Sequence, residues 1–185
     1  MKQEVKALED NNTWDIVDLP KGKNPIGSKW IYKIKYQENG EVDRYKTRLV
    51  AKGYSQKEGI DYHETFSPVI KMVTVRSFIP LAPSRGWNLC QMDVDNDFLQ
   101  GDLDEEVYME LPQGFQKQDK SKVCKLNKSL YELKQASRQW NIKLTEALID
   151  VRYCQSKYDY SMFTKKMDSD IVIILVYVDD NVDHG

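Results

Sequence analysis

Hydrophobic and polar residues alternate with a period of two between residues 28 and 52, which is the pattern of β-strands. Asn39 and Gly40 divide this stretch, and their tolerance of positive φ angles predicts a tight β-hairpin. Four side chains on one face are aromatic or aliphatic: Trp30, Tyr32, Ile34 and Tyr36. The other face is basic, with Lys29, Lys33, Lys35, Arg44, Lys46, Arg48 and Lys52. Aromatic residues at this spacing usually form sheet core, so we expect Trp30 and Tyr32 to be buried, with stacking on nucleic-acid bases as the alternative.

A second pattern, with apolar residues three and four positions apart, covers residues 129–150 and predicts the best-defined helix of the chain. Its apolar face consists of Leu130, Leu133, Trp140, Leu144, Ala147 and Leu148. Ser129 and Glu132 stand three residues apart at its start, which is the spacing of a capping box. We therefore expect the helix to begin at this pair.

The remaining elements are shorter. A helix is expected over residues 74–86, opened by Thr74 and interrupted by two prolines, Pro80 and Pro83. Apolar runs predict strands over residues 89–94, 107–109 and 171–178, the last of them buried. A turn leading into a short helix is expected over residues 95–104. Because helices and strands follow one another in mixed order, the sequence predicts an α+β fold.

The length of 185 residues and the hydrophobic content of 41% suit one folded domain. Residues 1–25 are polar and predict an N-terminal arm, followed by a domain over residues 26–185. The net charge is only −2, but it is unevenly spread. Residues 1–90 hold 15 Lys and Arg against 11 Asp and Glu, whereas residues 91–185 hold 12 against 18. A basic surface beside an acidic site is what phosphate and metal binding together require.

Three cysteines at positions 90, 124 and 154 are too widely spaced for a zinc site, and we expect reduced thiols in an intracellular protein. The sequence shows no signal-peptide pattern. The longest apolar stretch, residues 171–178, is too short to cross a bilayer, so no membrane association is expected.

The strongest chemical signal is the tetrapeptide Tyr177-Val178-Asp179-Asp180, which directly follows an apolar run. Paired carboxylates at the tip of a strand can hold divalent metal ions, and Asp93 is the candidate for a third ligand. The alternative is that the aspartate pair simply turns a surface hairpin.

Seven further blocks and this tetrapeptide together carry a family resemblance. They are NTW at 12–14, IGSKW at 26–30, YKTRLVAKG at 45–53, GIDY at 59–62, ETFSPV at 64–69, GDLDEEVYM at 101–109, LKQASRQW at 133–140 and YVDD at 177–180. In this order they closely resemble the reverse transcriptase of copia-type LTR retrotransposons, over nearly the whole chain. The resemblance implies the fingers and palm of a right-hand polymerase, incomplete at the C-terminus and without a thumb.

The reaction that this resemblance implies is templated DNA synthesis. A primer 3′-hydroxyl attacks the α-phosphate of a dNTP, and two Mg²⁺ ions, with Mn²⁺ as an alternative, stabilise the attacking and leaving oxygens. The implied ligands are the carboxylates of Asp93, Asp179 and Asp180 and the main-chain carbonyl of Val94. The implied partners are an RNA or DNA template with its primer, and the integrase and RNase H of a Pol polyprotein. The family works in cytoplasmic virus-like particles, which is the localisation we expect.

The resemblance also implies contacts to nucleotide or template. Phe98 would exclude a 2′-hydroxyl, with a core aromatic as the alternative. Gln135 would touch the new base pair, with a solvated helix face as the alternative. Arg48 and Lys46 would hold phosphates as charge-assisted donors, with a merely solvated basic face as the alternative. Tyr177 is also expected to contact nucleotide or template.

Four departures from the family pattern bear on activity. They are Asp97 in place of a small residue, Pro80 and Pro83 within the helix expected at 74–86, Glu132 in place of glycine, and Asn181-Val182-Asp183 in place of apolar residues. A carboxylate at position 97 would repel a triphosphate. We therefore expect the isolated chain to be inactive as a polymerase. The alternative reading is a nucleic-acid-binding remnant without catalysis, from a degenerate retroelement.

Overall fold

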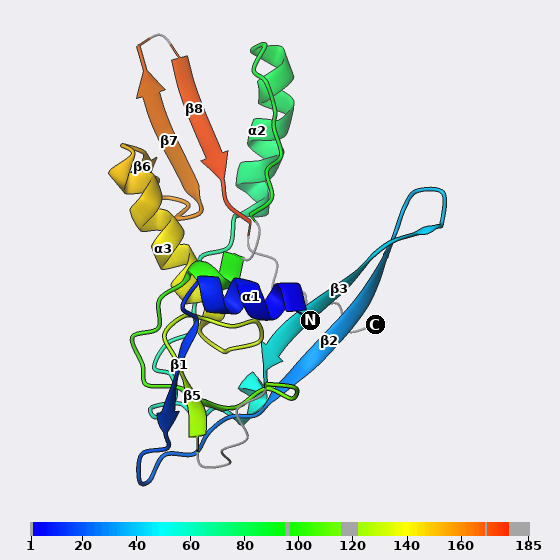
Figure 1. Cartoon of the computed structure of the whole chain (residues 1–185). Helices are drawn as coiled ribbons and strands as arrows, with labels where there is room; N and C mark the ends of the chain where they lie inside the picture. Colours follow the sequence, from blue (N-terminus) through cyan, green and yellow to red (C-terminus); the bar gives the residue numbers. More distant parts are fainter. Residues whose placement is uncertain (1, 95–96, 116–121, 169, 178–185) are drawn as a thin grey trace.

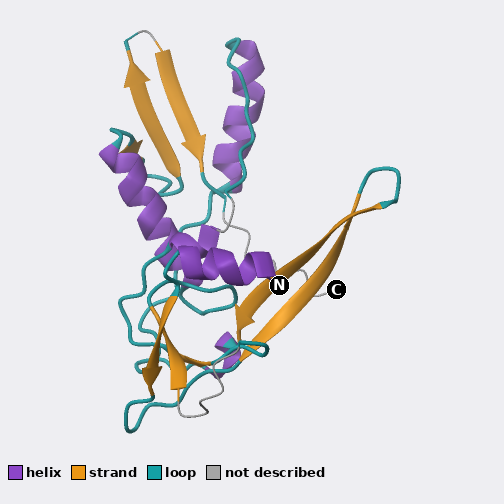
Figure 2. Ribbon diagram, viewed as in Figure 1, coloured by secondary structure: helices purple, strands orange, loops and turns teal. Residues whose placement is uncertain are grey.

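The structure is a computed structural model of the chain, and it describes residues 2–94, 97–115, 122–168 and 170–177. The helices are α1 (Lys2–Asp10), α2 (Met72–Ser84) and α3 (Ala136–Asp150), with short 3₁₀ helices η1 (Gly53–Ser55) and η2 (Asp97–Gln100). The strands are β1 (Trp14–Asp18), β2 (Ser28–Tyr36), β3 (Val42–Ala51), β4 (Tyr108–Glu110), β5 (Lys122–Leu126), β6 (Cys154–Gln155), β7 (Met162–Met167) and β8 (Asp170–Leu175). All strand pairs are antiparallel, in the orders β1-β5-β4, β2-β3 and β6-β7-β8. The mixture of helices and antiparallel sheets confirms the α+β prediction at this level (Figure 2).

The lower body of the molecule, as Figure 1 shows it, consists of α1, β1, β4, β5, the end of β3, η2 and the segment between β5 and α3. Its core joins residues from distant parts of the sequence: Leu8, Leu49, Val50, Leu99, Met109, Cys124 and Leu130, each at most 1% exposed. Since α1 contributes Leu8 and β1 pairs along its whole length with β5, the segment expected to be an N-terminal arm is part of this body.

Strands β2 and β3 form the predicted hairpin, which projects from the lower body (Figure 1). This hairpin is called the β2–β3 arm below and is distinct from the expected N-terminal arm. The hairpin prediction is confirmed, but the turn is wider than the expected tight turn, because the Gln37 N–H donates to the Glu41 carbonyl. Only Gly40 of the Asn-Gly pair has a positive φ angle, at 85°. Burial falls steeply along β3, from 0% exposure at Ala51 to 76% at Tyr45.

The aromatic face of this arm is only partly buried. Trp30 packs against the core and donates its Nε1–H to the Gln113 carbonyl over 3.0 Å. Tyr32, in contrast, is 63% exposed, so the prediction that it is a core residue was wrong. The core ends about where Trp30 lies, and a period-two pattern alone does not reveal how far a hairpin extends beyond its body.

The upper region consists of α2, the segment of residues 85–94 and the sheet β6-β7-β8, with α3 leading up to it (Figure 1). Helix α2 runs through Pro80 and Pro83 rather than being interrupted by them. Its start is also different from the prediction, because Lys71 is the N-cap and the Thr74 hydroxyl donates to Asp159.

Two predicted elements of this region have a different structure. Residues 89–94 form no strand, and Leu89 and Met92 are 63% and 78% exposed. Strand β8 is present, but Ile171 is 47% exposed, so the expectation of a fully buried strand was wrong. Apolar residues predict burial only where a partner covers them, and over much of these segments the described part of the chain supplies no such cover.

The expected capping box at the start of the long helix is not formed. Helix α3 begins at Ala136, seven residues later, and its N-cap Gln135 makes no side-chain capping hydrogen bond. Glu132 adopts φ +66°, which is outside helical geometry, and the Ser129 hydroxyl is buried without a hydrogen-bond partner among the described residues. The segment from 129 to 135 instead packs into the core of the lower body through Leu130, Tyr131 and Leu133.

Two simpler findings complete the fold. The described cysteines are all free, and burial raises the pKa of the Cys124 thiol to about 12, so this thiol is a packing group at neutral pH. No helix within the described ranges is both long and apolar enough to cross a membrane.

Candidate functional site

Three side chains from distant segments stack in the lower body: Arg48 of β3, Tyr131 of the segment before α3, and Phe98 of η2. The Arg48 guanidinium carbon lies 4.6 Å from the centre of the Tyr131 ring. The Tyr131 and Phe98 rings are 5.3 Å apart and nearly perpendicular, with an interplanar angle of 84°. Cation–π and edge-to-face contacts of this kind fix both the position and the orientation of the groups they join.

The charge of the Arg48 guanidinium acts on two carboxyl groups, those of Asp97 and Glu4. Burial raises the pKa of Asp97, while the Phe98 backbone N–H and the Arg48 charge act against this increase and the Asp93 charge adds to it. Burial likewise raises the pKa of Glu4, opposed by the Leu49 backbone N–H and by the charges of Arg48 and Lys46. Arg48 thus lies in a half-buried setting where its charge acts on two carboxyl groups.

Arg48 nevertheless keeps unused hydrogen-bonding capacity. Its Nε–H is buried and has no hydrogen-bond partner within the described ranges. A buried donor without an acceptor is unfavourable, by about 1–3 kcal/mol. An anionic ligand that brings an oxygen to this nitrogen would remove that penalty. Lys46 lies on the same face of β3, two residues away, and is half-buried.

The proposed metal ligands are only partly described. Asp93 and Val94 lie in the extended segment after α2 and are exposed, and the Asp93 charge reaches Asp97. Asp179 and Asp180 lie outside the described residues, so whether they meet Asp93 stays a prediction. Within the described residues, no three His, Cys, Asp or Glu side chains are grouped closely enough to hold a metal ion.

Tyr177 directly precedes that undescribed segment. It is 64% exposed, and it follows Val176, whose N–H donates to the Ser161 carbonyl over 2.8 Å. The chain therefore leaves the β6-β7-β8 sheet at Tyr177 with this ring in solvent. Its predicted contact with nucleotide or template stays a prediction.

Gln135 is fully buried, and both ends of its amide are occupied. Its Oε1 accepts a hydrogen bond from Gln56 Nε2, and its Nε2 donates to the Asp61 carbonyl, each over 3.1 Å. The amide therefore ties the 53–62 segment to the start of α3, and it is not on the solvated helix face that was the alternative. A contact with template or nucleotide stays a prediction, and it would require these bonds to break.

A second tie lies between η1 and the segment before α3. A Cβ on Gly53 would lie 1.9 Å from the Glu132 carbonyl oxygen, so the two backbones approach as closely as only glycine allows. The Tyr131 carbonyl accepts a hydrogen bond from the Ala51 N–H over 3.0 Å. The backbone on both sides of Tyr131 is therefore fixed to the end of β3.

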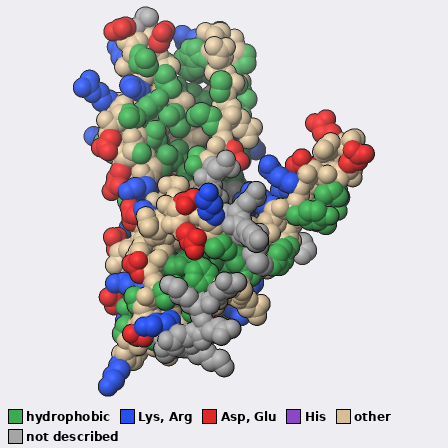
Figure 3. All heavy atoms as spheres, in the orientation of Figure 1, with side chains coloured by type: hydrophobic (Ala, Val, Ile, Leu, Met, Phe, Trp, Pro, Cys, Tyr) green, Lys and Arg blue, Asp and Glu red, His purple; other side chains and the backbone are tan. Residues whose placement is uncertain are grey.

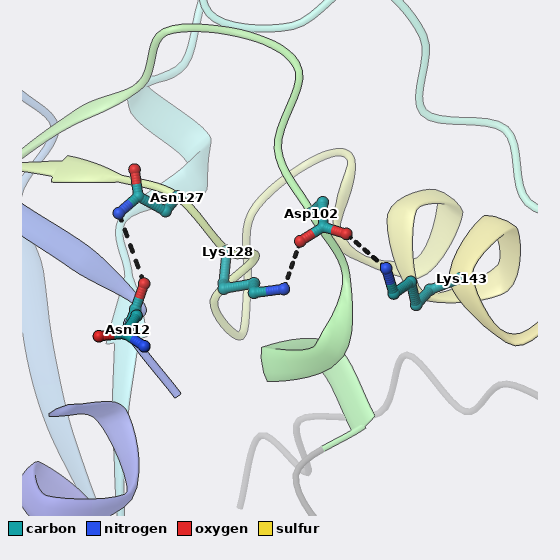
Figure 4. A network of polar contacts seen from close by, with 5 residues as sticks. All are labelled: Asn12, Asp102, Asn127, Lys128 and Lys143. Atoms are coloured by element: carbon teal, nitrogen blue, oxygen red, sulfur yellow. Dashed lines mark hydrogen bonds and ion pairs between the residues drawn. The ribbon is translucent and has the colours of Figure 1, made fainter. Parts of the chain in front are cut away.

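Asp102, two residues after η2, forms a third connection between distant segments (Figure 4). Its carboxylate accepts hydrogen bonds from Lys128 and, over 2.7 Å, from Lys143 of α3. These two hydrogen bonds, with Lys128 the larger contributor, lower the pKa of Asp102. Nearby, Asn127 reaches the Asn12 carbonyl, so the same corner also joins the start of β1. Asp102, in the block at 101–109, therefore supports the structure at this point.

Sequence reasoning identified Arg48 and Phe98 but missed Tyr131, which connects them. Tyr131 falls within the run that was read as the first turn of a helix, and the pairing that reveals its role is with residues 33 and 83 positions away. No periodicity or spacing in the sequence indicates this pairing; in the structure, a parallel bridge between Val50 and Tyr131 places Tyr131 beside the basic strand.

Comparison with known proteins gives a consistent result. The family described as "Reverse transcriptase (RNA-dependent DNA polymerase)" matches residues 11–185. The chain is 46% identical over 182 residues to "Retrovirus-related Pol polyprotein from transposon TNT 1-94" of Nicotiana tabacum, covering 97% of this chain and 14% of that protein. It is 47% and 46% identical, over 97% of its length, to the corresponding polyproteins from transposons RE1 and RE2 of Arabidopsis thaliana, covering 12% of each. The chain thus spans only a small part of these relatives, and no solved structure matches it.

Proposed function

Because the chain belongs to the reverse transcriptase (RNA-dependent DNA polymerase) family, we propose that it forms the fingers and palm of a copia-type retrotransposon polymerase that joins nucleotides by two-metal phosphoryl transfer. In this assignment the β2–β3 arm belongs to the fingers, and the β6-β7-β8 sheet with residues 85–94 belongs to the palm. The observation that carries the proposal is the meeting of Arg48, Phe98 and Tyr131 next to the acidic segment that contains Asp93.

The proposed chemistry forms one P–O bond and breaks another. The primer 3′-hydroxyl oxygen attacks the α-phosphorus of the dNTP, the hydroxyl proton passes to water, and the bond to pyrophosphate breaks. Divalent metal ions, when bound, stabilise the negative charge that develops on the attacking and leaving oxygens. Asp93, Asp179, Asp180 and the Val94 carbonyl would hold them with the hard oxygen ligands that Mg²⁺ prefers, and the exposed Asp93 fits this use.

The residues around the triphosphate would act by position and charge. Arg48, whose Nε–H has no partner in the described part of the chain, and Lys46 would donate to phosphate oxygens from one face of β3. Phe98, 8% exposed and held edge-on by Tyr131, would lie beneath the sugar and exclude a 2′-hydroxyl. Asp97 opposes this arrangement, because its carboxylate would compete with the triphosphate for the charge of Arg48.

The partners follow from the same assignment. The substrates would be an RNA or DNA template with a primer and a dNTP, and the remainder of a Pol polyprotein would supply integrase and RNase H. The relatives carry the name Pol polyprotein and are much longer than this chain. Cytoplasmic virus-like particles would be the place of action.

A second candidate, a nucleic-acid-binding remnant without catalysis, is favoured by one specific observation. Asp97 places a partly buried carboxyl within reach of the Arg48 and Asp93 charges, where a triphosphate would have to bind. The basic face of the arm, with Lys33, Lys35 and Arg44 on the same side as Arg48, would still attract a phosphate backbone.

Two measurements on the whole chain separate these functions. Primer extension on poly(rA)·oligo(dT) with Mg²⁺ is expected to be very weak for the natural chain, to increase for Asp97→Ala, and to vanish when Asp93→Asn is added to Asp97→Ala. Binding of the same primer–template is measured at increasing salt, with Arg48→Ala expected to weaken it and Asp93→Asn expected to leave it unchanged.

Each result has one meaning. Extension that depends on Asp93 supports the polymerase. Salt-sensitive binding lost in Arg48→Ala, with no extension even in Asp97→Ala, supports the remnant. If the chain neither extends nor binds the primer–template, both functions are wrong. A matched control, Lys166→Ala on β7, removes a basic side chain far from the arm and should change neither measurement.

A further inference from the structure

We propose that Tyr131 is a positioning residue of the nucleotide site, holding the Arg48 guanidinium and the Phe98 ring in one fixed relation so that phosphate binding and sugar selection depend on the same side chain. This inference rests on the proposed function, because it assigns a role within the site that the polymerase assignment defines. It adds a residue that contacts neither metal nor primer in that assignment.

The first step is the rigidity of Tyr131 itself. Its side chain is 3% exposed, and its carbonyl accepts the Ala51 N–H over 3.0 Å. The next residue, Glu132, packs its carbonyl against Gly53, where no Cβ would fit. The ring is therefore anchored to the end of β3, the same strand that carries Arg48. Movement of this ring relative to β3 would require the backbone on both sides of it to separate from the strand.

The second step concerns Arg48. An arginine side chain loses about 2 kcal/mol of rotamer freedom when it is fixed in one geometry. Stacking over the Tyr131 ring at 4.6 Å supplies that order before any ligand arrives. A guanidinium that stacks on a ring still presents its N–H groups in its own plane, and the Nε–H of Arg48 has no hydrogen-bond partner among the described residues. The guanidinium is thus pre-oriented, and among these residues its Nε–H is left available for a phosphate oxygen.

The third step concerns Phe98. It follows Asp97 in η2, and its edge-to-face contact with Tyr131 at 5.3 Å and 84° fixes the plane of its ring. A ring that excludes a 2′-hydroxyl by steric contact can do so only if it does not move away. Replacing Tyr131 by a smaller side chain would leave space beside Phe98 and allow that movement. Selection of the sugar would then weaken together with phosphate binding.

The experiment compares Tyr131→Leu, which removes the ring, with Tyr131→Phe, which keeps it. Equilibrium binding of dTTP and of ribothymidine triphosphate, which differs from dTTP only by its 2′-hydroxyl, is measured with Mg²⁺ for the whole chain by titration calorimetry. The Leu variant should bind dTTP up to about thirtyfold more weakly, because the roughly 2 kcal/mol of Arg48 rotamer freedom would then be lost on binding. Its preference for dTTP over ribothymidine triphosphate should also decrease. The Phe variant should match the natural chain in both respects.

A second readout needs no nucleotide. The Arg48 Nε–H resonance in a ¹H–¹⁵N spectrum is shifted by the ring current of Tyr131. This shift should persist in Tyr131→Phe and disappear in Tyr131→Leu. Phe163→Leu is the matched control, since Phe163 is a fully buried aromatic residue of β7 outside the stack. It should lose comparable stability while leaving the Arg48 resonance and the dTTP preference unchanged.

The outcomes are distinct. If Tyr131→Leu keeps both the resonance shift and the nucleotide preference, Tyr131 positions nothing and the inference is overturned. A change common to Tyr131→Leu and Phe163→Leu would reduce it to a stability effect, which also overturns it. If the natural chain binds no dTTP, the polymerase assignment fails at this point, and an unchanged Arg48 resonance in Tyr131→Leu then rejects the positioning role as well. A resonance lost only in Tyr131→Leu supports that role even in this case.

Discussion

The lower body and the upper region bury their apolar side chains to very different extents. In the lower body Leu49, Leu99 and Leu130 are at most 1% exposed. In the upper region the apolar side chains of α2 and of residues 85–94 are largely open to solvent: Met72, Val73, Ile79, Leu89 and Met92, between 53% and 78% exposed. Figure 3 shows apolar side chains gathered on the surface of this region.

The candidate site is divided in the same way. The side proposed to bind phosphate and sugar, with Arg48, Phe98 and Tyr131, is part of the lower body and is fixed by packing. The side proposed to bind metal begins at Asp93, in an exposed segment of the upper region without secondary structure. Catalysis by proximity requires reacting groups to be held in place. Among the described residues, packing therefore holds Phe98 and Tyr131 in place, whereas Asp93 is exposed.

The largest expected effect tests this contrast with two matched substitutions. Leu130→Ala, in the core of the lower body, should lower the free energy of unfolding by about 3 kcal/mol, because it leaves a cavity. Leu89→Ala removes the same atoms from a side chain that is 63% exposed. It should therefore change the free energy of unfolding by less than about 0.5 kcal/mol. Urea unfolding followed by circular dichroism measures both.

Equal costs for the two leucine variants would contradict the contrast. That result would mean that Leu89 is buried in solution, against a surface that the described residues do not supply. The slope of the free energy of unfolding against urea concentration, the m-value, should be the same for both variants. An equal slope shows that both variants lose the same folded structure.

A smaller effect concerns a group of hydrogen bonds around Asp159 in the upper region. The Asp159 carboxylate is 5% exposed, and it accepts hydrogen bonds from the Lys71 N–H at 3.1 Å, the Thr74 hydroxyl at 2.6 Å and the Ser161 N–H at 3.1 Å. Burial alone would raise the pKa of Asp159, but these hydrogen bonds outweigh burial and lower it. These hydrogen bonds thus tie the start of α2 to the turn before β7.

The sign of the pH dependence follows from the lowered pKa. The charged form is favoured by folding, so the stabilisation is fully present above the unfolded pKa of about 3.9 and is lost as pH falls below it. Asp159→Asn should lower the free energy of unfolding by about 1.5–3 kcal/mol at pH 7. The difference from the natural chain should shrink as pH falls below about 4. Asp150→Asn, at an exposed position of α3, serves as the control and should lack this pattern.

Local signals predicted what local physics decides. The β2–β3 hairpin followed from alternation and an Asn-Gly pair, and the turn is where Gly40 places it. The site residues Arg48 and Phe98 were found because their blocks resemble a family, not because the pattern located them in space. Their arrangement around Tyr131 depends on side-chain contacts between segments far apart, which neither periodicity nor spacing encodes.

The failures have a common physical cause. The capping box of Ser129 and Glu132 did not form because the same segment makes tertiary contacts with β3 and η1, which outweigh a local capping preference of about 1 kcal/mol. The strand expected at residues 89–94 lacks hydrogen-bonded pairing within the described part of the chain. A single strand gains nothing without a neighbour, so its apolar pattern alone could not decide its structure.

The smallest expected effect tests how firmly the lower body imposes its backbone. Glu132 has φ +66°, a left-handed conformation in which a Cβ costs roughly 1–2 kcal/mol. Glu132→Gly should therefore be more stable than Glu132→Ala by about 1 kcal/mol. Both variants lose the contact with Lys29 at 3.3 Å, so their difference isolates the backbone. Glu146, exposed within α3, is the control for which the opposite order is expected. There the Ala variant should be more stable than the Gly variant by about 1 kcal/mol, because glycine is unfavourable inside a helix. The same order at both positions, measured by urea unfolding, would show that Glu132 is helical in solution and that Tyr131 is not held against β3 as described.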